Sequence, residues 1–250
     1  MKINQILGRL LAVVSAAVMV AVPAQATLVG RDINGLAVAG SSAGAVFLYD
    51  TTLNITWLRN ANVNGLMNWG QANTWAAGYS LGSYSGWRLP TMVDTGTSGC
   101  NFSYAGGTDC GYNVQTTSGS TVYSEMASLF YDTLGNKAYC PPGNATCIGP
   151  GVPQTSWGLT NVGDFLNMQS NFYWSGTEYA PGPGGAWGFD TGNGGQDAND
   201  KNIPFYAMAV RPGDVLAAQV PEPESLVLAL TALGAMALVR RRRALGSSAL

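Results

Sequence analysis

The 250-residue sequence contains no histidine. This absence excludes Ser-His-Asp triads, Cys-His dyads, histidine-ligated zinc and proton transfer by an imidazole, so an enzyme would depend on carboxylates, cysteine or lysine.

Charged side chains are also scarce: residues 27–220 carry six basic and twelve acidic ones, a net charge of −6. That balance excludes a basic nucleic-acid interface and argues against bulk electrostatic adhesion to anionic polysaccharides. Neutral sugars and cation-bridged polymers stay open as ligands.

Long apolar runs occur only near the two ends of the chain. At the start, Lys2 and Arg9 precede the uncharged residues 10–22, and Ala24 and Ala26 form an A-x-A cleavage site. We therefore expect residues 1–26 to be a signal peptide that engages the Sec export machinery and is removed by signal peptidase. A retained anchor is the alternative, but the run is shorter than the ~18 residues that a spanning helix usually needs.

The other apolar run, Leu226–Val239, lies within residues 221–250. Its length alone would also suit a buried helix. The arginines that follow it cannot enter hydrocarbon cheaply, however, and would stop a short transmembrane helix on the cytoplasmic side. The run is preceded by a stiff Pro-Glu-Pro segment that a protease could bind as an extended strand. The residues that define this arrangement are Pro221, Glu222, Pro223, Arg240, Arg241, Arg242 and Arg243.

This order of parts resembles the PEP-CTERM sorting signal of Gram-negative bacteria. The resemblance implies processing by an exosortase-type membrane protease and an association with exopolysaccharide and biofilm. The protein would then cross the inner membrane, be anchored transiently, and reach the cell surface or the extracellular space.

The segment between the two signals, residues 27–220, has the length of one large domain or two small ones, and we interpret it as one. It contains all 25 aromatic residues and thirty of the glycines, which predicts a substantial core joined by many loops. Helical spacing and stop signals predict helices near 68–77 and 122–134. Short apolar runs predict strands at 45–49, 55–59, 87–89, 172–175, 186–190 and 207–211. Two helices among scattered strands indicate an α+β fold.

Four cysteines, Cys100, Cys110, Cys140 and Cys147, occur in this exported segment. Disulfides are the expected state of cysteines outside the cytoplasm, and three pairings are open. We favour Cys100 with Cys110 and Cys140 with Cys147, because each pair would close a loop with little apolar content. A four-thiolate metal site is the alternative, although neither pair has the C-x2-C spacing typical of zinc.

A second resemblance covers most of the domain, from Gly44 to Pro212. Its most specific pieces are Trp87-Arg88-Leu89-Pro90-Thr91 and Tyr173-Trp174-Ser175, supported by the segments 49–62 and 210–211. The segment resembles the domain of unknown function named after the C-terminal region of the Lcl collagen-like adhesin. That family is similar to C-type lectins and formylglycine-generating enzymes. The resemblance thus implies a C-type lectin-like fold, with two helices packed on small antiparallel sheets and long Gly-rich loops.

The sequence departs from that family in two ways. About thirty residues containing Cys100 and Cys110 are inserted after the Trp-Arg-Leu-Pro-Thr string. No cysteine follows Cys147, so the catalytic cysteines of formylglycine-generating enzymes have no counterpart, and a shared fold does not transfer their activity.

Arg88 is open to two interpretations, a ligand contact or a buried ion pair. The tryptophans of the matching segments, Trp57, Trp69, Trp87 and Trp174, are expected in the core.

Oxygen-bearing side chains are concentrated late in the chain. Calcium takes six to eight oxygen ligands, and a glycine-rich loop could supply them. The pattern does not fit the EF-hand template, and a solvated hairpin tip is the alternative. The candidate Ca2+ ligands are Asp190, Asn193, Asp197, Asn199 and Asp200.

Aromatic side chains near this loop are candidates for stacking on sugar rings. They are Trp157, Tyr179 and Trp187, although burial in the core is the expected state for two of the three. Together these features favour a noncatalytic surface or matrix protein that binds exopolysaccharide. A carboxylate glycosidase using Glu125 or Glu178 is the catalytic alternative. A purely structural surface protein is the third.

Overall fold

The computed structural model describes residues 27–98, 109–143 and 153–216. The predicted signal peptide with Ala24 and Ala26 lies outside these ranges, as do Cys100, Cys147 and the sorting segment from Pro221 to Arg243. Within the described ranges no helix has the length and apolarity needed to cross a membrane. The predicted span at Leu226–Val239 is not among the residues described.

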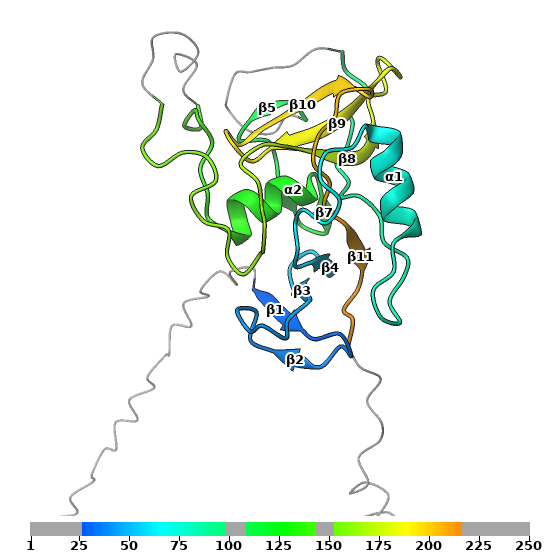
Figure 1. Ribbon diagram of the computed structural model, residues 1–250. Helices are drawn as coiled ribbons and strands as arrows, with labels where there is room; N and C mark the ends of the chain where they lie inside the picture. Colours follow the sequence, from blue (N-terminus) through cyan, green and yellow to red (C-terminus); the bar gives the residue numbers. More distant parts are fainter. Residues whose placement is uncertain (1–26, 99–108, 144–152, 217–250) are drawn as a thin grey trace, which may run out of the picture.

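The described chain combines two short helices with small antiparallel sheets (Figure 1). The larger sheet has five strands in the order β11-β4-β3-β1-β2. The predicted strands at 45–49 and 55–59 are confirmed in this sheet with slightly shifted bounds, and the one at 207–211 begins only at Val210. The strand predicted at 87–89 is not formed, because only Arg88 makes an isolated bridge. The strands of the larger sheet are β1 (Leu28–Arg31), β2 (Ala37–Val38), β3 (Phe47–Asp50), β4 (Ile55–Leu58) and β11 (Val210–Pro212).

A second sheet of four strands has the order β5-β10-β9-β8, and a separate two-stranded ribbon pairs β6 with β7. The predicted strands at 172–175 and 186–190 are confirmed here, whereas β10 was not predicted. The strands are β5 (Gly111–Tyr112), β6 (Thr117–Ser118), β7 (Thr121–Val122), β8 (Phe172–Glu178), β9 (Gly185–Asp190) and β10 (Gly195–Asp200).

Helix α1 (Trp69–Gly78) begins where its sequence predicts. The Asn68 side chain accepts from the Gln71 N–H, and the Gln71 side chain accepts from the Asn68 N–H, which completes a capping box. Ala72 and Ala76 are buried on one face. The Trp69 indole donates to Ser175 O at 2.8 Å and so attaches the helix to β8.

The second predicted helix, 122–134, is shorter and less regular than its spacing suggested. Val122 belongs to β7, and α2 covers only Glu125–Ala127 before the chain widens into a π-helix, η1 (Ser128–Thr133). The Leu134 N–H donates to Leu129 O, five residues back. This wider turn still points the apolar residues inward, because Leu129, Phe130 and Leu134 are all buried.

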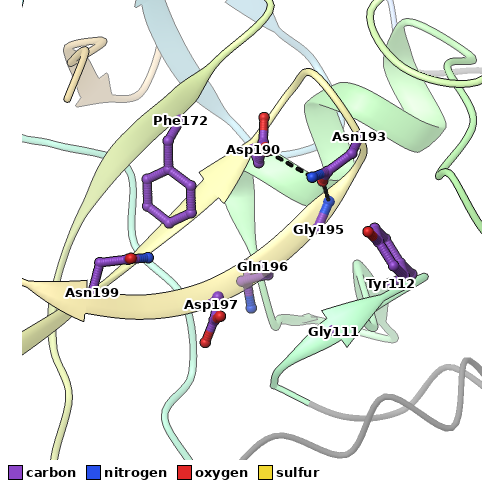
Figure 2. A pocket seen from close by; sticks show the side chains of 9 residues that line it. All are labelled: Gly111, Tyr112, Phe172, Asp190, Asn193, Gly195, Gln196, Asp197 and Asn199. Carbon is purple, nitrogen blue, oxygen red and sulfur yellow. Dashed lines mark hydrogen bonds between the residues drawn. The ribbon is translucent and has the colours of Figure 1, made fainter. Parts of the chain in front are cut away.

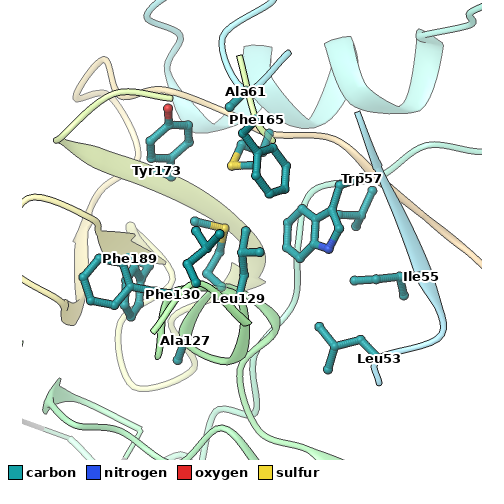
Figure 3. Close-up of a cluster of buried hydrophobic side chains, with 14 of the residues drawn as sticks. Leu53, Ile55, Trp57, Ala61, Ala127, Leu129, Phe130, Phe165, Tyr173 and Phe189 are labelled. Atoms are coloured by element: carbon teal, nitrogen blue, oxygen red, sulfur yellow. The ribbon is translucent and has the colours of Figure 1, made fainter. Parts of the chain in front are cut away.

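The core lies between the two sheets and combines aromatic rings with aliphatic side chains (Figure 3). Trp57 of β4, Phe130 of η1, and Tyr173 and Phe189 of the second sheet belong to one buried cluster. Burial of large aromatic side chains is the main apolar contribution to folding in such a core. The expectation of core packing is confirmed for Trp57, Trp87 and Trp174, which are buried, while Trp69 is partly buried.

The Trp-Arg-Leu-Pro-Thr string joins the two sheets and α2. Arg88 forms a backbone bridge with Val210 of β11, and Pro90 O accepts from the Gly176 N–H of β8. Arg88 also forms a bidentate ion pair with Glu125, with both N–O distances at 2.7 Å. The ion-pair interpretation of Arg88 is therefore confirmed, and this string has a structural role.

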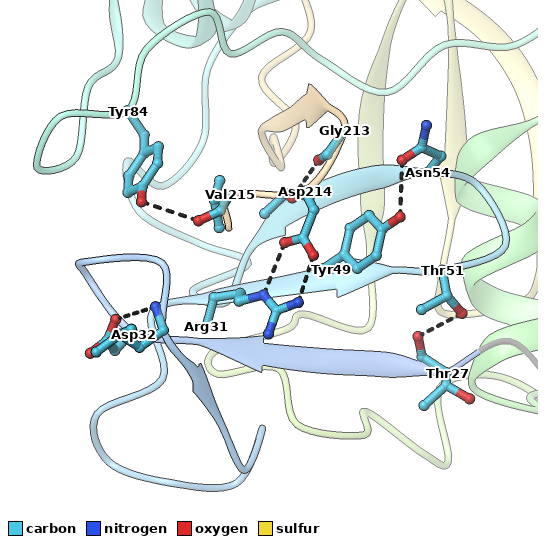
Figure 4. A network of polar contacts seen from close by, with 12 residues as sticks. Thr27, Arg31, Asp32, Tyr49, Thr51, Asn54, Tyr84, Gly213, Asp214 and Val215 are labelled. Atoms are coloured by element: carbon cyan, nitrogen blue, oxygen red, sulfur yellow. Dashed lines mark hydrogen bonds and ion pairs between the residues drawn. The ribbon is translucent and has the colours of Figure 1, made fainter. Parts of the chain in front are cut away.

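The two ends of the described domain lie together (Figure 4). Arg31 of β1 forms a bidentate ion pair with Asp214, which follows β11, at 2.9 and 2.6 Å. Burial opposes the charge, but the hydrogen bonds and the neighbouring carboxylate of Asp214 raise the pKa of Arg31 overall. In Figure 1 the described chain begins at β1 and ends near β2, both in the larger sheet's half of the molecule, and the β9–β10 hairpin lies at the opposite end.

Candidate functional site

A pocket of about 240 Å³ opens beside β10, at the end of the molecule away from the chain ends (Figure 2). Its wall combines carboxylates, amides and aromatic rings. The lining residues come from β5, β8, the turn after β9, and β10: Gly111, Tyr112, Phe172, Asp190, Asn193, Gly195, Gln196, Asp197 and Asn199.

The pocket is shaped by the β9–β10 hairpin, in which Asp190 pairs with Gly195. Asp190 accepts from the Gly192 N–H at 2.8 Å and from the Asn193 amide at 2.7 Å, while Asn193 Oδ1 accepts from the Gly195 N–H. Gly194 adopts φ 74°, and a Cβ there would lie 2.8 Å from Ala138 Cα. The hairpin-tip alternative is therefore correct, with Thr191 and Gly194 buried and Gly192 and Asn193 half-buried.

Gly188 of β9 makes room for one wall of the pocket. It pairs with Asp197 of β10, and the Phe172 ring lies against the position that a Cβ would occupy. A side chain at Gly188 would also come within 2.6 Å of Tyr173 O. The aromatic wall at Phe172 thus depends on the glycine beneath it.

Of the two carboxyl groups of the pocket, that of Asp190 belongs to a half-buried residue and that of Asp197 to an exposed one. Burial raises the pKa of Asp190, against the lowering effect of the Gly192 N–H, and burial likewise raises the pKa of Asp197, against that of the Ala198 N–H. Asp197 Oδ1 also lies 3.5 Å from Cys110 Sγ. Carboxylates in such a pocket can accept hydrogen bonds from the hydroxyl groups of a ligand that displaces water from it.

No lysine or arginine is among the residues that line this pocket. Elsewhere in the described ranges, Arg31 pairs with Asp214, and Arg88 with Glu125. Arg59 donates to the carbonyl oxygens of Ser42, Ala45 and Asp164. The site therefore has no cation to receive a sulfated or uronic-acid sugar.

The five predicted calcium ligands are not gathered at one point. Asp190, Asn193, Asp197 and Asn199 line the pocket, but Asp200 is outside its lining and pairs with Gly185 at the far end of β10. Six strand residues extend roughly 20 Å, at about 3.3 Å each, so one ion cannot reach both ends. In the described residues no group of three or more His, Cys, Asp or Glu side chains could hold a metal ion.

The predicted glycan-binding aromatics have different surroundings. Trp187 is 1% exposed, and its indole donates to Asp94 at 2.8 Å, so this ring offers no surface to a sugar. Tyr179 is half-buried, with its ring edge-on to Trp187. Trp157 is 39% exposed. Sequence analysis missed Tyr112 and Phe172, because neither lies in a motif and long-range pairing alone brings them to the pocket.

The two candidate catalytic glutamates lie in ion pairs. Glu125 is 6% exposed and binds Arg88 and the Thr91 N–H, which occupies both of its oxygens. Glu178 pairs with Lys201 at the end of β8. Neither glutamate lines the pocket beside β10.

Cys110 and Cys140 are disulfide-bonded, and no cysteine in the described ranges is free. Cys100 and Cys147 lie outside those ranges, so the predicted pairing stays a prediction. Cys110 precedes β5 and Cys140 packs with Tyr112 and Tyr139. Both cysteines therefore adjoin the segment that carries Tyr112 into the pocket.

Comparison with known families gives two matches. A family model described as the Lcl C-terminal domain matches residues 47–211, and one described as the PEP-CTERM protein-sorting motif matches residues 219–243. No curated protein and no solved structure matches the chain. The first match contains the pocket, and the second begins directly after the described domain.

Proposed function

The chain belongs to the Lcl C-terminal domain family, and from this premise we propose that it is a noncatalytic surface protein whose pocket beside β10 binds uncharged sugars of extracellular polysaccharide. The PEP-CTERM motif marks it as an exported protein that an exosortase processes and sorts to the cell surface. The observation that supports the binding role most strongly is the pocket's mixture of aromatic, amide and carboxylate groups without a basic side chain.

The chemistry of this wall suits a sugar. A sugar ring has an apolar C–H surface that can pack on Tyr112 or Phe172, and hydroxyl groups that can donate to Asp197 and Asn199. Directional hydrogen bonds in a pocket that excludes water provide specificity. The excess of acidic over basic groups disfavours anionic polymers, because like charges repel at short range.

The position of the pocket suits a protein held at a membrane during sorting. The described domain ends beside β1, and the matched sorting motif follows at residue 219. The pocket lies at the other end of the molecule (Figure 1). A protein held through its C-terminal segment would thus present the pocket away from the anchor.

A C-type lectin-like fold is part of this proposal. It is supported by the two short helices, the small antiparallel sheets and the adjacent ends of the domain. A noncatalytic role is supported by Glu125 and Glu178, whose carboxylates pair with arginine and lysine and lie outside the pocket lining.

A glycan array tests the proposal. The full-length protein is applied with calcium and again with a chelator, and we expect binding to neutral glycans in both conditions. Asp197→Asn should weaken binding about tenfold, the effect of losing roughly 1.4 kcal/mol. Asp200→Asn on the same strand, outside the pocket lining, is the control and should bind as the wild type does.

Three results would point elsewhere. Binding only with calcium would indicate a cation between protein and sugar. Turnover of a glycan that is lost in Glu178→Gln would establish the glycosidase alternative. Absence of binding in both conditions would leave a structural surface protein.

A further inference from the structure

A row of aromatic rings leads away from the pocket and ends at an exposed tryptophan. Tyr112, at the pocket, has its ring centroid 6.2 Å from that of Tyr139. The Tyr139 centroid lies 4.8 Å from that of Trp157, and these two rings meet edge to face. Tyr112 and Tyr139 are half-buried, while Trp157 is the exposed end of the row.

The row is attached to the turn that forms the pocket. The Tyr139 N–H donates to Asn193 O at 2.7 Å, and Asn193 lines the pocket. Gly158, next to Trp157, lies so close to the same turn that a Cβ would meet Gly192 O at 2.5 Å. Pocket and row are therefore parts of one packed unit.

The backbone around Trp157 is held in an uncommon conformation. Ser156 has φ 58° and Gly158 has φ 82°, so residues on both sides of the tryptophan lie in the left-handed region. A non-glycine residue such as Ser156 is strained there and persists only where its surroundings fix it. Here the Gly158 N–H donates to Lys137 O at 2.8 Å. A large apolar ring is thus held in a fixed, solvent-facing position.

We propose that Tyr112, Tyr139 and Trp157 form an aromatic ridge that extends the pocket into a site for consecutive sugar units of one uncharged polysaccharide chain. This inference rests on the proposed function and specifies its ligand as a polymer, not a terminal monosaccharide. One unit occupies the pocket against Asp197 and Asn199, and following units pack on the ridge toward Trp157.

The chemistry of the ridge favours a sugar chain over a protein partner. A protein interface needs a broad apolar patch, whereas the ridge is a single row of rings. A second hollow of about 460 Å³ beside Ala138 has a mixed lining, with Val114 and Pro142 next to Asn113, Gln154 and Lys137. Amide and hydroxyl groups flanking a row of rings match a ligand that has both C–H faces and hydroxyl edges.

The test measures binding of the full-length protein to immobilised polysaccharides by biolayer interferometry. The panel contains hydroxyethyl cellulose, dextran and galactomannan as neutral polymers, with alginate as the anionic one. We expect the wild type to bind at least one neutral polymer. Trp157→Ala should weaken that binding at least tenfold, and Trp157→Phe, which keeps an aromatic face, should restore most of it.

Trp75→Ala is the control, because Trp75 is a half-buried ring on α1 that also packs beside a tyrosine, Tyr79, with ring centroids 5.6 Å apart. It should leave binding unchanged. Each variant is first shown by near-ultraviolet circular dichroism to be folded. Oligosaccharides from the bound polymer should compete better as they lengthen, and the monosaccharide should compete weakly.

The outcomes separate the two proposals. If the wild type binds but Trp157→Ala binds equally well, the ridge is refuted and the pocket proposal stands. Equal competition by monosaccharide and oligosaccharide would likewise refute an extended site. If the wild type binds no member of the panel, the proposed function itself fails, and the ridge with it.

Discussion

Replacing Glu125 by alanine should destabilise the protein strongly, because this carboxylate joins three parts of the fold. It accepts from Arg88 through two hydrogen bonds of 2.7 Å and from the Thr91 N–H at 2.7 Å. Its own N–H donates to Thr91 O at the start of α2. The Arg88–Thr91 segment in turn contacts β11 and β8.

The expected magnitude follows from the burial of the pair. Removing one partner of a fully buried ion pair costs about 3–5 kcal/mol, and a hydrogen bond to a charged group contributes about 1.5–3 kcal/mol. The Glu125 side chain is 8% exposed, but that of Arg88 is 34% exposed and can regain water when its partner is lost. We therefore expect Glu125→Ala to lower the free energy of unfolding by about 3 kcal/mol.

Urea denaturation of the full-length protein, followed by tryptophan fluorescence, measures this loss. Glu178→Ala is the control, since Glu178 is 49% exposed in its pair with Lys201 and such surface pairs contribute about 0–1 kcal/mol. In a double-mutant cycle, Arg88→Ala combined with Glu125→Ala should show a coupling of about 2 kcal/mol. A loss below about 1 kcal/mol for Glu125→Ala would refute the structural role of the pair.

The remaining predictions concern a glycine, an acidic group and the disulfides. Gly188→Ala should cost about 1–3 kcal/mol in urea denaturation because its Cβ would collide with Phe172, whereas Gly184→Ala, with open space around it, should be neutral. Burial raises the pKa of Asp94, but hydrogen bonds from the Ala180 N–H, the Trp187 indole and the Gly96 N–H outweigh it and the pKa is lowered overall. Asp94 therefore stabilises the fold above about pH 4, and acidification below that value should destabilise the wild type more than Asp94→Asn. Reduction should lower the melting temperature, and mass spectrometry of the alkylated protein should show Cys100 joined to Cys110 and Cys140 to Cys147; any other pairing would contradict the sequence prediction.

The sequence predicted the helices and strands whose signals lie in residues close together in the chain. Helical spacing and the stop at Gly78 predicted α1, and the apolar runs predicted at β3, β4, β8 and β9 are strands. These signals depend on residues close together in the chain, so a sequence contains them directly. The ion pair of Arg88 was anticipated as one of two roles, but its partner was not.

The parts that depend on long-range packing were not predicted. Strand β10 reads Gly-Gln-Asp-Ala-Asn-Asp, and its residue types are mostly unfavourable in strands, so pairing with β9 and β5 determines its conformation. The glycine-rich turn at 191–194, following a strand, did indicate a hairpin tip as one interpretation, but not the strand that follows it. The π-helical turn has no signature in the spacing of Leu129 and Leu134. The pocket unites segments more than sixty residues apart, such as β5 and β8, and no local pattern reports that proximity.

The central claim is that the pocket beside β10 is a sugar site, and hydrogen–deuterium exchange tests it most directly. The full-length protein is measured with and without the neutral polysaccharide that it binds best. The account predicts slower exchange at Gly111–Tyr112 and along residues 185–200, with no change in α1. Unchanged exchange in the β9–β10 hairpin, together with protection of another face, would show that the polysaccharide binds elsewhere and would contradict the account.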